Sequence, residues 1–456
     1  MSFDLGIEGG TVVGARGRRR ANVYVSGGRV AAVTGELLPA GERMDAGGLL
    51  VLPGMIDAHV HFMDPGDAER EDFPTGTAAA AAAGVTTVIE HTHAHPVRSA
   101  EELEAKRAHL RTRARVDFGI GAHAWPDRLD DVEGVWRAGA AFIKAFTCTT
   151  HGVPGFQPGP LRDLFDRVAA AGAVCMVHCE DESLTAEAER ALRGAERTDG
   201  GIVPGWRNRD AELTALGTAS LLARRTGARM VAAHVSHPDA LDIVARERAL
   251  GARITVESCP QYFELLEGEV LEHGAFRKFT PPARARSRHD LDAMWHALAH
   301  GRIDYVSSDH APSTREQKQA GSIWDVHFGL PGVDTTLPVL LNAAAAGRIG
   351  YERLAEAYAE TPAAVYGLAP AKGQIAPGAD ADLVLVDPER RWTVRDADIR
   401  SRAGWSPFSG RELVGGGVRT YVRGRLAYDG FDVVAEPGAG RFLPGAGALT
   451  GSAVAP

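Results

Sequence analysis

The chain has 456 residues and a formal net charge of −9 at pH 7, and 45% of its residues are hydrophobic. This length is enough for one large α/β domain with a smaller one and a full core. The mild negative charge, with no basic block longer than RGRRR at residues 16–20, argues against a nucleic-acid partner. No apolar run reaches 18 residues, and the N-terminus has no basic stretch followed by an apolar one. We therefore expect a cytoplasmic protein with no membrane partner.

Two residue types are rare in this chain. The four cysteines, Cys148, Cys175, Cys179 and Cys259, have irregular spacing, which is not the pattern of a disulfide framework. We expect them to be small buried hydrophobic residues in a reducing compartment. Only five of the 50 basic residues are lysines, so Lys144, in the middle of AAFIKAFT, needs an explanation.

Both ends of the chain have the pattern of a small antiparallel sheet. Residues 1–50 and 380–430 read as short strands separated by Gly-rich turns. Neither end supplies enough strands for a stable sheet of its own, so we expect residues 1–51 and 370–445 to pair into one small β-sandwich. The segment after residue 433, rich in Gly, Ala and Pro, is expected to be loosely ordered.

Between the two ends, residues 52–369 alternate apolar, strand-like runs with helical stretches. We expect eight strands, over residues 50–61, 85–92, 117–124, 140–146, 173–179, 228–236, 252–259 and 303–309. This alternation predicts the α/β class and a (β/α)8 TIM barrel. A doubly wound sheet would alternate similarly. No GxGxxG or GxxxxGK[ST] motif follows the first strand, however, which weakens that alternative.

Six polar residues end the apolar runs. In a (β/α)8 barrel such positions meet at one rim, so we predict a metal site there, made by His59, His61, Lys144, His178, His234 and Asp309. An isolated histidine pair would be structural about as often as functional, but six such groups on one rim favour metal binding. Nitrogen and oxygen ligands suit zinc first, then manganese, iron or cobalt. Six ligands are too many for one tetrahedral catalytic zinc, so we expect two divalent ions.

Lys144 is the unusual member of this set, because a lysine ammonium has no acceptor for a cation. Its neighbours Phe142, Ile143 and Phe146 predict a desolvated, neutral amine. A neutral amine takes up carbon dioxide to form a carbamate, whose two oxygens can bridge two cations. A lysine that reaches solvent or forms a salt bridge is the alternative. Its position at the rim beside the histidines favours the carbamate.

An ordered set of motifs resembles a known family. DAHVH, IKAF, VHCED, HVSH and SSDHAP, with ESCPQYF, TPPARARS and GQIAPGADADLVLVDP, resemble the cyclic amidohydrolases of the amidohydrolase superfamily. That group includes dihydroorotases, allantoinases and dihydropyrimidinases (hydantoinases). The resemblance covers nearly the whole chain, the two ends included, and it implies a homodimer or homotetramer.

The resemblance also implies a role for each ligand: His59 and His61 would hold the more buried metal with Asp309, His178 and His234 the second, and carboxylated Lys144 would bridge them. Two such cations activate a water and polarise a ring carbonyl. Asp309 would take the proton of the attacking water as general base and return it to the ring nitrogen as general acid. A cyclic amide or ureide would open to an N-carbamoyl or ureido acid, and the reverse reaction would close a ring.

Departures from the family pattern bear on the substrate. Dihydroorotases have an arginine at the position of Met63, and that arginine binds the substrate carboxylate. Thr149 stands where hydantoinases have a tyrosine. Both differences favour an allantoinase-like activity, allantoin to allantoate. The alternatives are a hydantoinase or dihydropyrimidinase, a dihydroorotase-like paralogue, or a ring-closing biosynthetic enzyme. A non-enzymatic scaffold is disfavoured because all six ligand positions are filled.

The second strand and one loop supply further candidates. HTHAHP would place His91, His93 and His95 on one face, as substrate contacts or as rim histidines without a role. A further metal on this trio is disfavoured. Loop 147–160 is either a lid over the mouth or an inert surface loop. The predicted substrate contacts are Met63, His93, His95, Thr149, His151, Cys259 and Phe328.

Overall fold

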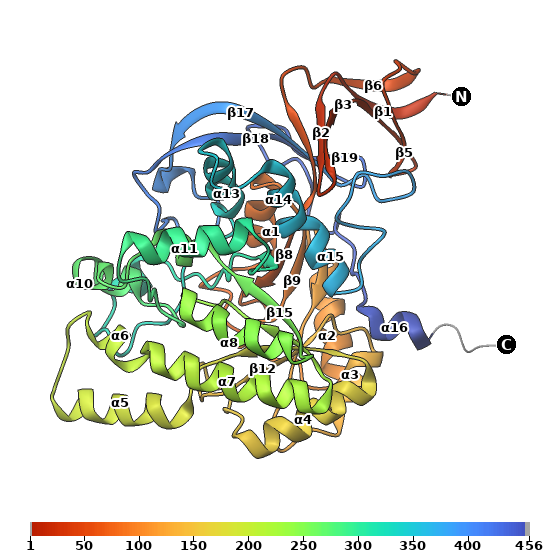
Figure 1. Cartoon of the computed structure of the whole chain (residues 1–456). Coiled ribbons are helices and arrows are strands. Elements are labelled where there is room, and N and C mark those ends of the chain that lie inside the picture. Colours follow the sequence, from red (N-terminus) through yellow and green to blue (C-terminus); the bar gives the residue numbers. More distant parts are fainter. Residues whose placement is uncertain (1, 452–456) are drawn as a thin grey trace.

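A computed structural model describes residues 2–451, and its centre is a closed parallel barrel (Figure 1). Two sheets, in the orders β10-β9-β8 and β11-β12-β13-β14-β15-β16, supply its wall. A bridge between Val60 and His310 closes the barrel, with the His61 N–H donating to the His310 carbonyl at 2.7 Å. The strands are β8 (Met55–Val60), β9 (Val85–Glu90), β10 (Asp117–Ile120), β11 (Ala122–His123), β12 (Ile143–Phe146), β13 (Val174–His178), β14 (Arg229–Ala232), β15 (Arg253–Ser258) and β16 (Tyr305–Val306). The predicted (β/α)8 barrel is confirmed.

One strand position of the barrel is interrupted at Gly121, between β10 and β11. The Gly121 N–H donates to the Glu90 carbonyl at 2.9 Å, and the Ala122 N–H donates to the Phe142 carbonyl at 2.9 Å. The wall therefore stays continuous across the interruption. A side chain at residue 121 would overlap the ring of Phe142 and press on the Cβ of His91, 3.0 Å away. Glycine here leaves space for two inward side chains.

Helices cover the outside of the barrel. Asp72 caps the first of them by accepting a hydrogen bond from the Thr75 N–H at 2.8 Å, and Gly172 ends the fourth in a left-handed conformation. The helices are α1 (Phe73–Ala82), α2 (Ala100–Arg111), α3 (Asp131–Arg137), α4 (Pro158–Ala171), α5 (Glu182–Gly194), α6 (Ile202–Trp206), α7 (Arg209–Thr226), α8 (Pro238–Ala249), α9 (Pro260–Glu264), α10 (Glu269–His273), α11 (Arg288–Ala299), α12 (Arg315–Gln319), α13 (Thr336–Ala345), α14 (Tyr351–Ala355), α15 (Thr361–Val365) and α16 (Ala446–Gly451). Among residues 2–451, none of these helices is long and apolar enough to cross a membrane.

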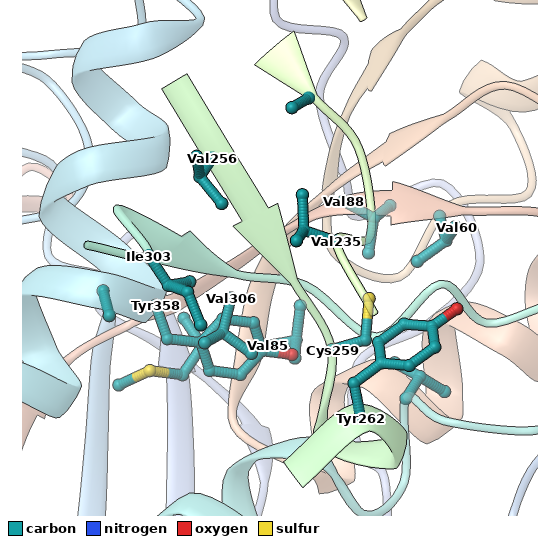
Figure 2. Packing of buried hydrophobic residues seen from close by; sticks show 14 of the residues in the cluster. Val60, Val85, Val88, Val235, Val256, Cys259, Tyr262, Ile303, Val306 and Tyr358 are labelled. Carbon is teal, nitrogen blue, oxygen red and sulfur yellow. The ribbon is translucent and has the colours of Figure 1, made fainter. Parts of the chain in front are cut away.

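Alternation along the strands separates two hydrophobic layers. Val85, Val88 and Val256 belong to the large cluster of strand and helix side chains, part of which Figure 2 shows. Ile89, which alternates with Val88 in β9, and Met176, which alternates with Cys175 and Val177 in β13, belong to a separate cluster. Because side chains alternate between the two faces of a strand, this second cluster fills the barrel interior beneath the strand ends.

The two chain ends do combine into one pair of sheets. One has the order β5-β4-β1-β6 and the other β19-β18-β17-β7-β2-β3. Antiparallel pairing of β7 with β17 joins the two ends, which confirms the predicted sandwich. The strands are β1 (Phe3–Glu8), β2 (Thr11–Gly14), β3 (Gly17–Arg20), β4 (Asn22–Ser26), β5 (Arg29–Thr34), β6 (Ala40–Asp45), β7 (Leu50–Pro53), β17 (Leu383–Thr393), β18 (Glu412–Val422) and β19 (Arg425–Tyr428).

Two sequence expectations about these elements are wrong. The strand expected over residues 50–61 breaks at Gly54, so β7 lies in the sandwich and only β8 in the barrel. A side chain at Gly54 would overlap Thr86. Residues 434–451 are also ordered, against the expectation for the segment after residue 433, whose last five residues, 452–456, lie outside the described residues. The Gly438 and Gly440 N–H groups donate to the Ala114 carbonyl at 2.8 and 3.0 Å, and the Leu443 N–H donates to the Phe118 carbonyl at 2.7 Å.

Candidate metal centre

The six predicted ligands come together in one cavity at the carboxyl ends of the strands. His59 lies in β8, Lys144 in β12 and His178 at the end of β13, while His61, His234 and Asp309 lie within three residues after the ends of β8, β14 and β16. The cavity is lined by His59, His61, His93, Lys144, Phe146, His151, His178, His234, Phe279, Thr280, Asp309, Ala311, Phe328 and Gly329. The parallel strands therefore bring residues 250 positions apart in sequence to one site.

A second, larger cavity of about 630 Å³ lies between α1 and β17. Four arginines line it, Arg390, Arg391, Arg395 and Arg400. Among the described residues, its lining contains none of the six predicted ligands. The nature of the lining side chains, and not the size of the cavity, therefore identifies the candidate site.

His59 and His61 converge on one carboxylate. The Nε2 atoms of His59 and His61 lie 3.2 and 3.4 Å from Oδ1 of Asp309. On the other side of the His59 ring, Nδ1 lies 2.7 Å from Oε1 of the buried Glu257. Glu257 also accepts hydrogen bonds from the His234 N–H and the Tyr305 hydroxyl, at 3.1 and 2.8 Å. A carboxylate placed in this way fixes the His59 tautomer and leaves Nε2 free to bind a cation.

His178 and His234 form a second pair across the cavity. Nδ1 of His178 lies 3.0 Å from Nε2 of His234, and Nε2 of His178 lies 2.8 Å from Oε2 of Glu180. Burial opposes ionisation of Glu180, but the charge of Arg207, the hydrogen bond with His178 and the charge of Arg284 hold its pKa well below the usual range. Glu180 therefore orients His178 as Glu257 orients His59.

Lys144 lies between the two histidine pairs with its amine buried. The residue is 1% exposed, and Nζ has no hydrogen-bond partner among the described residues. Burial lowers the pKa of Lys144 below its ordinary value, which favours the neutral amine. Buried amines are normally hydrogen-bonded. An unpartnered Nζ beside four imidazoles and a carboxylate therefore fits a lysine that carries a carboxyl group and binds cations through it.

Asp309 and His234 share an unusual backbone conformation. Their φ angles are +49° and +39°, a left-handed region that residues other than glycine seldom adopt. Such strain is commonly stored at functional sites. Burial acts to raise the pKa of Asp309, but the nearby His59 and His61 and the hydrogen bond from His61 lower it. Asp309 is thus held ionised, in the form that binds a cation or accepts a proton.

Three of the predicted substrate contacts line the cavity. The rings of His93 and His151 stack with their centroids 4.0 Å apart, and the Phe328 ring meets His151 edge-on at 6.1 Å. Phe328 is also packed against Trp206, with ring centroids 5.4 Å apart. These aromatic side chains line the cavity together, and the His93 ring also lies beside His61, with centroids 5.0 Å apart.

The other four predicted contacts do not line the cavity. Met63 is fully buried with φ +57°, and its sulfur accepts a hydrogen bond from the Thr92 hydroxyl at 3.2 Å. Strand β8 ends at Val60, so the alternation that placed Met63 beside the histidines no longer applies. His95 and Thr149 are exposed, and Cys259 is fully buried just before α9.

The three histidines after β9 do not share a face. Strand β9 ends one residue before His91, and the chain then turns, so His91 is fully buried, His93 half-buried and His95 exposed. The expected common face is therefore wrong. The His91 ring instead lies beside the first pair, with centroids 4.5 Å from His59 and 4.4 Å from His61.

Sequence reasoning assigned no role to several residues of the site. Glu257 and Glu180 orient ligands, and Thr280 donates to Oε2 of Glu180 at 2.7 Å. The two glutamates had a usable signal, because each lies at the end of an apolar strand-like run, as the ligands do. Phe279 and Thr280 lie in a loop far from any strand end, where no periodicity marks them.

Comparison with known proteins agrees with this geometry. Residues 50–407 match the model of the Amidohydrolase family. The chain is 37% identical over 449 residues to an allantoinase of Rubrobacter xylanophilus, covering 97% of this chain and 98% of that one. It is 37% identical over 420 residues to a dihydroorotase of Halobacterium salinarum, covering 87% and 94%.

Solved structures give the same result for the fold. The L-hydantoinase (dihydropyrimidinase) from Arthrobacter aurescens superposes with a TM-score of 0.92 at 30% identity, covering 97% of this chain and 100% of that one. The dihydropyrimidinase from Brevibacillus agri gives a TM-score of 0.90 at 28% identity, covering 96% and 98%. The chain has the barrel, a sandwich built from both chain ends and a histidine-rich cavity, and it belongs to the amidohydrolase family.

Proposed function

We propose that the protein is a binuclear-metal hydrolase that opens the ring C–N bond of a cyclic amide or ureide, in the manner of allantoin to allantoate. One observation carries the proposal: four histidines, one lysine and one aspartate, supplied by five strands or the residues just after them, line one cavity. The relatives named as an allantoinase, a dihydroorotase and an L-hydantoinase support the class of reaction.

The donors in the cavity fit two divalent cations, with zinc first. Imidazole nitrogens and carboxylate oxygens suit zinc and its first-row neighbours. His59 and His61 with Asp309 would hold one cation, and His178 and His234 the other. The buried, unpartnered amine of Lys144 supports N6-carboxylation by carbon dioxide, which would turn it into a bridging anion. When bound, such cations polarise a ring carbonyl and acidify a water.

The chain's own residues would then move the proton. Asp309, ionised and 3.2 Å from His59, takes the proton of the attacking water as general base. It returns that proton to the ring nitrogen as the C–N bond breaks. The ring therefore opens, and the product is an open-chain acid. Glu257 and Glu180 keep His59 and His178 in fixed orientations while the charge on the substrate changes.

The cavity lining supports a neutral ring over dihydroorotate. No arginine lines it among the described residues, so a substrate carboxylate would lack a bidentate partner. The stacked His93 and His151 and the ring of Phe328 offer flat surfaces to a planar ureide. Hydantoinase activity is the second candidate, favoured by the TM-score of 0.92 to an L-hydantoinase. A ring-closing reaction on another cyclic amide would use the same groups in reverse.

Metal analysis with a substrate panel tests this function. We expect about two divalent ions per chain, and faster turnover of allantoin than of hydantoin, dihydrouracil or dihydroorotate. Removing the general base in Asp309→Asn should lower kcat by about 10²–10⁴. Lys144→Ala should lower both metal content and rate, while the exposed His95→Gln serves as control. A protein that retains no divalent ion, or a fully active Asp309→Asn, would overturn the mechanism. Activity on dihydroorotate alone would overturn the substrate.

We propose further that the protein is a homodimer or homotetramer in the cytoplasm. The family resemblance supports the assembly, and light scattering of the purified chain measures it. The four cysteines support a reducing compartment, because all are buried and none forms a disulfide within residues 2–451. Cell fractionation with an antibody to the chain checks the location.

A further inference from the structure

His91 is a buried polar side chain that the mechanism above does not use. It is 0% exposed, and neither ring nitrogen has a hydrogen-bond partner among the described residues. Buried polar groups nearly always have a partner, and each exception calls for an explanation. The cost of an unpaired buried donor or acceptor is of the order of 1–3 kcal/mol. His91 has this cost twice unless something binds its nitrogens.

The surroundings of His91 direct it toward the first histidine pair. Its N–H donates to the Val60 carbonyl at 3.2 Å, so the pairing of β9 with β8 continues to His91, two residues beyond Ile89 of the interior cluster. Phe142 packs edge-on against one side of the ring, with centroids 4.9 Å apart, and offers no hydrogen bond. On the other side lie His59 and His61, at 4.5 and 4.4 Å. The missing side chain at Gly121 makes room for this arrangement.

Three imidazoles meet there. His59, His61 and His91 each present one ring nitrogen such that all three atoms lie within 4.8 Å of one another, and all three residues are buried. Nδ1 of His61 also has no hydrogen-bond partner among the described residues. Three histidine nitrogens are a ligand set that zinc uses in catalytic sites.

We propose that His91 is a third imidazole ligand, with His59 and His61, for one divalent cation. This inference rests on the proposed metal centre and extends its ligand set by a residue that strand-end reasoning left without a role. A site with three imidazoles favours zinc, cobalt or nickel over manganese, which prefers oxygen ligands. The first cation is therefore bound by three imidazole nitrogens and not only by the two of His59 and His61.

The competing explanation is a packing histidine. Under that explanation, replacing His91 with an apolar side chain of similar length removes two unpaired polar atoms, so it stabilises the metal-free protein and leaves metal binding unchanged. Under the proposal, the same replacement weakens the binding of one cation. His91→Met separates the two, because methionine fills irregular apolar space well.

The full chain is stripped of metal and titrated with Zn²⁺ against a competing chelator, and separately with Co²⁺ while its visible absorption is recorded. We expect His91→Met to weaken the tighter zinc site by at least about tenfold and to alter the Co²⁺ spectrum, because a nitrogen ligand is lost. His123→Met is the matched control, since His123 is also buried with two unpartnered nitrogens but lies outside the three-histidine set. It should bind both ions like the parent.

The outcomes are distinct. A His91→Met protein with the parent's zinc affinity and Co²⁺ spectrum overturns the ligand role of His91 and leaves the metal centre standing. A parent chain that binds no divalent ion overturns the metal centre and this inference with it. If His91→Met does not fold, His91→Gln, which keeps polarity and similar volume, is titrated in its place with the same expected loss.

Discussion

Glu71 is a buried carboxyl whose ionisation the fold opposes, and its replacement by glutamine tests this directly. It is 0% exposed and accepts hydrogen bonds from the Arg402 and Asp72 N–H groups, at 2.9 and 3.2 Å. Nε2 of His310, next to Asp309 in sequence, lies 3.6 Å away. Burial raises the pKa of Glu71 from 4.5 to about 8. Glutamine keeps one of the two acceptor oxygens and cannot ionise.

The sign and size of the effect follow from linkage. The folded protein binds the Glu71 proton more tightly than the unfolded chain, so this carboxyl stabilises the fold fully below about pH 4.5 and less as the pH rises to 8. Each pH unit in this window costs about 1.4 kcal/mol, which amounts to a loss on the order of 5 kcal/mol. His310, whose burial lowers its pKa to about 4, acts in the opposite sense below pH 6.5. Because His310 is present in both the parent and Glu71→Gln, its contribution cancels in the difference between them.

The assay is the free energy of unfolding in urea, measured for parent and Glu71→Gln at equal metal content from pH 5 to pH 8. The advantage of the parent over Glu71→Gln should fall by several kcal/mol across this range. Glu436→Gln, at an exposed position, should show no such trend. A parent-to-variant difference that stays constant with pH would refute the reasoning.

Three further predictions concern residues that support the site without lining the cavity. The carboxylate of buried Glu90 lies 3.1 Å from Nζ of Lys106, so Lys106→Met leaves this carboxylate without its cation. The variant should be less stable by about 3–5 kcal/mol in urea unfolding. An unchanged unfolding midpoint would contradict this prediction. Gly121→Val forces a side chain into the neighbouring Phe142 ring and should lower the free energy of unfolding by about 1–3 kcal/mol, seen as a lower thermal midpoint. The control Gly134→Val, at an exposed position of α3, should lower the midpoint less. Glu257→Gln loosens His59 and should weaken zinc binding about 10–100-fold in chelator competition; equal affinity would remove its orienting role.

The convergence of the six candidate ligands on one cavity could be predicted from the sequence because a parallel barrel has a simple rule. Each apolar run that ends in a histidine, lysine or aspartate places that residue at one common rim. His178 and Asp309 needed no knowledge of their neighbours to be assigned there. Their orienting partners follow the same rule, since Glu257 also ends a strand, but only the distance of 2.7 Å to His59 shows its role.

Other features could not be predicted, for physical reasons. Residues 50–61 read as one strand, and the sequence does not show that β7 pairs with β17 of the sandwich while β8 pairs with β9 of the barrel. The position of Met63 was inferred from an alternation that stops when β8 ends at Val60. In the C-terminal segment, Gly, Ala and Pro indicated disorder by composition. There, the small size of Gly440 is what allows its close approach to the barrel backbone.

The pairing of β7 with β17 has a consequence during synthesis. Strand β7 ends at Pro53 and its antiparallel partner begins at Leu383, 330 residues later. At a translation rate of about 5–20 residues per second, roughly 15–65 s separate the appearance of the two strands. For that time the N-terminal half of the sandwich exists without its native neighbour, and its backbone donors and acceptors are open to other chains. Until β17 is made, this unpaired edge is a place where pairing with another chain competes with native folding.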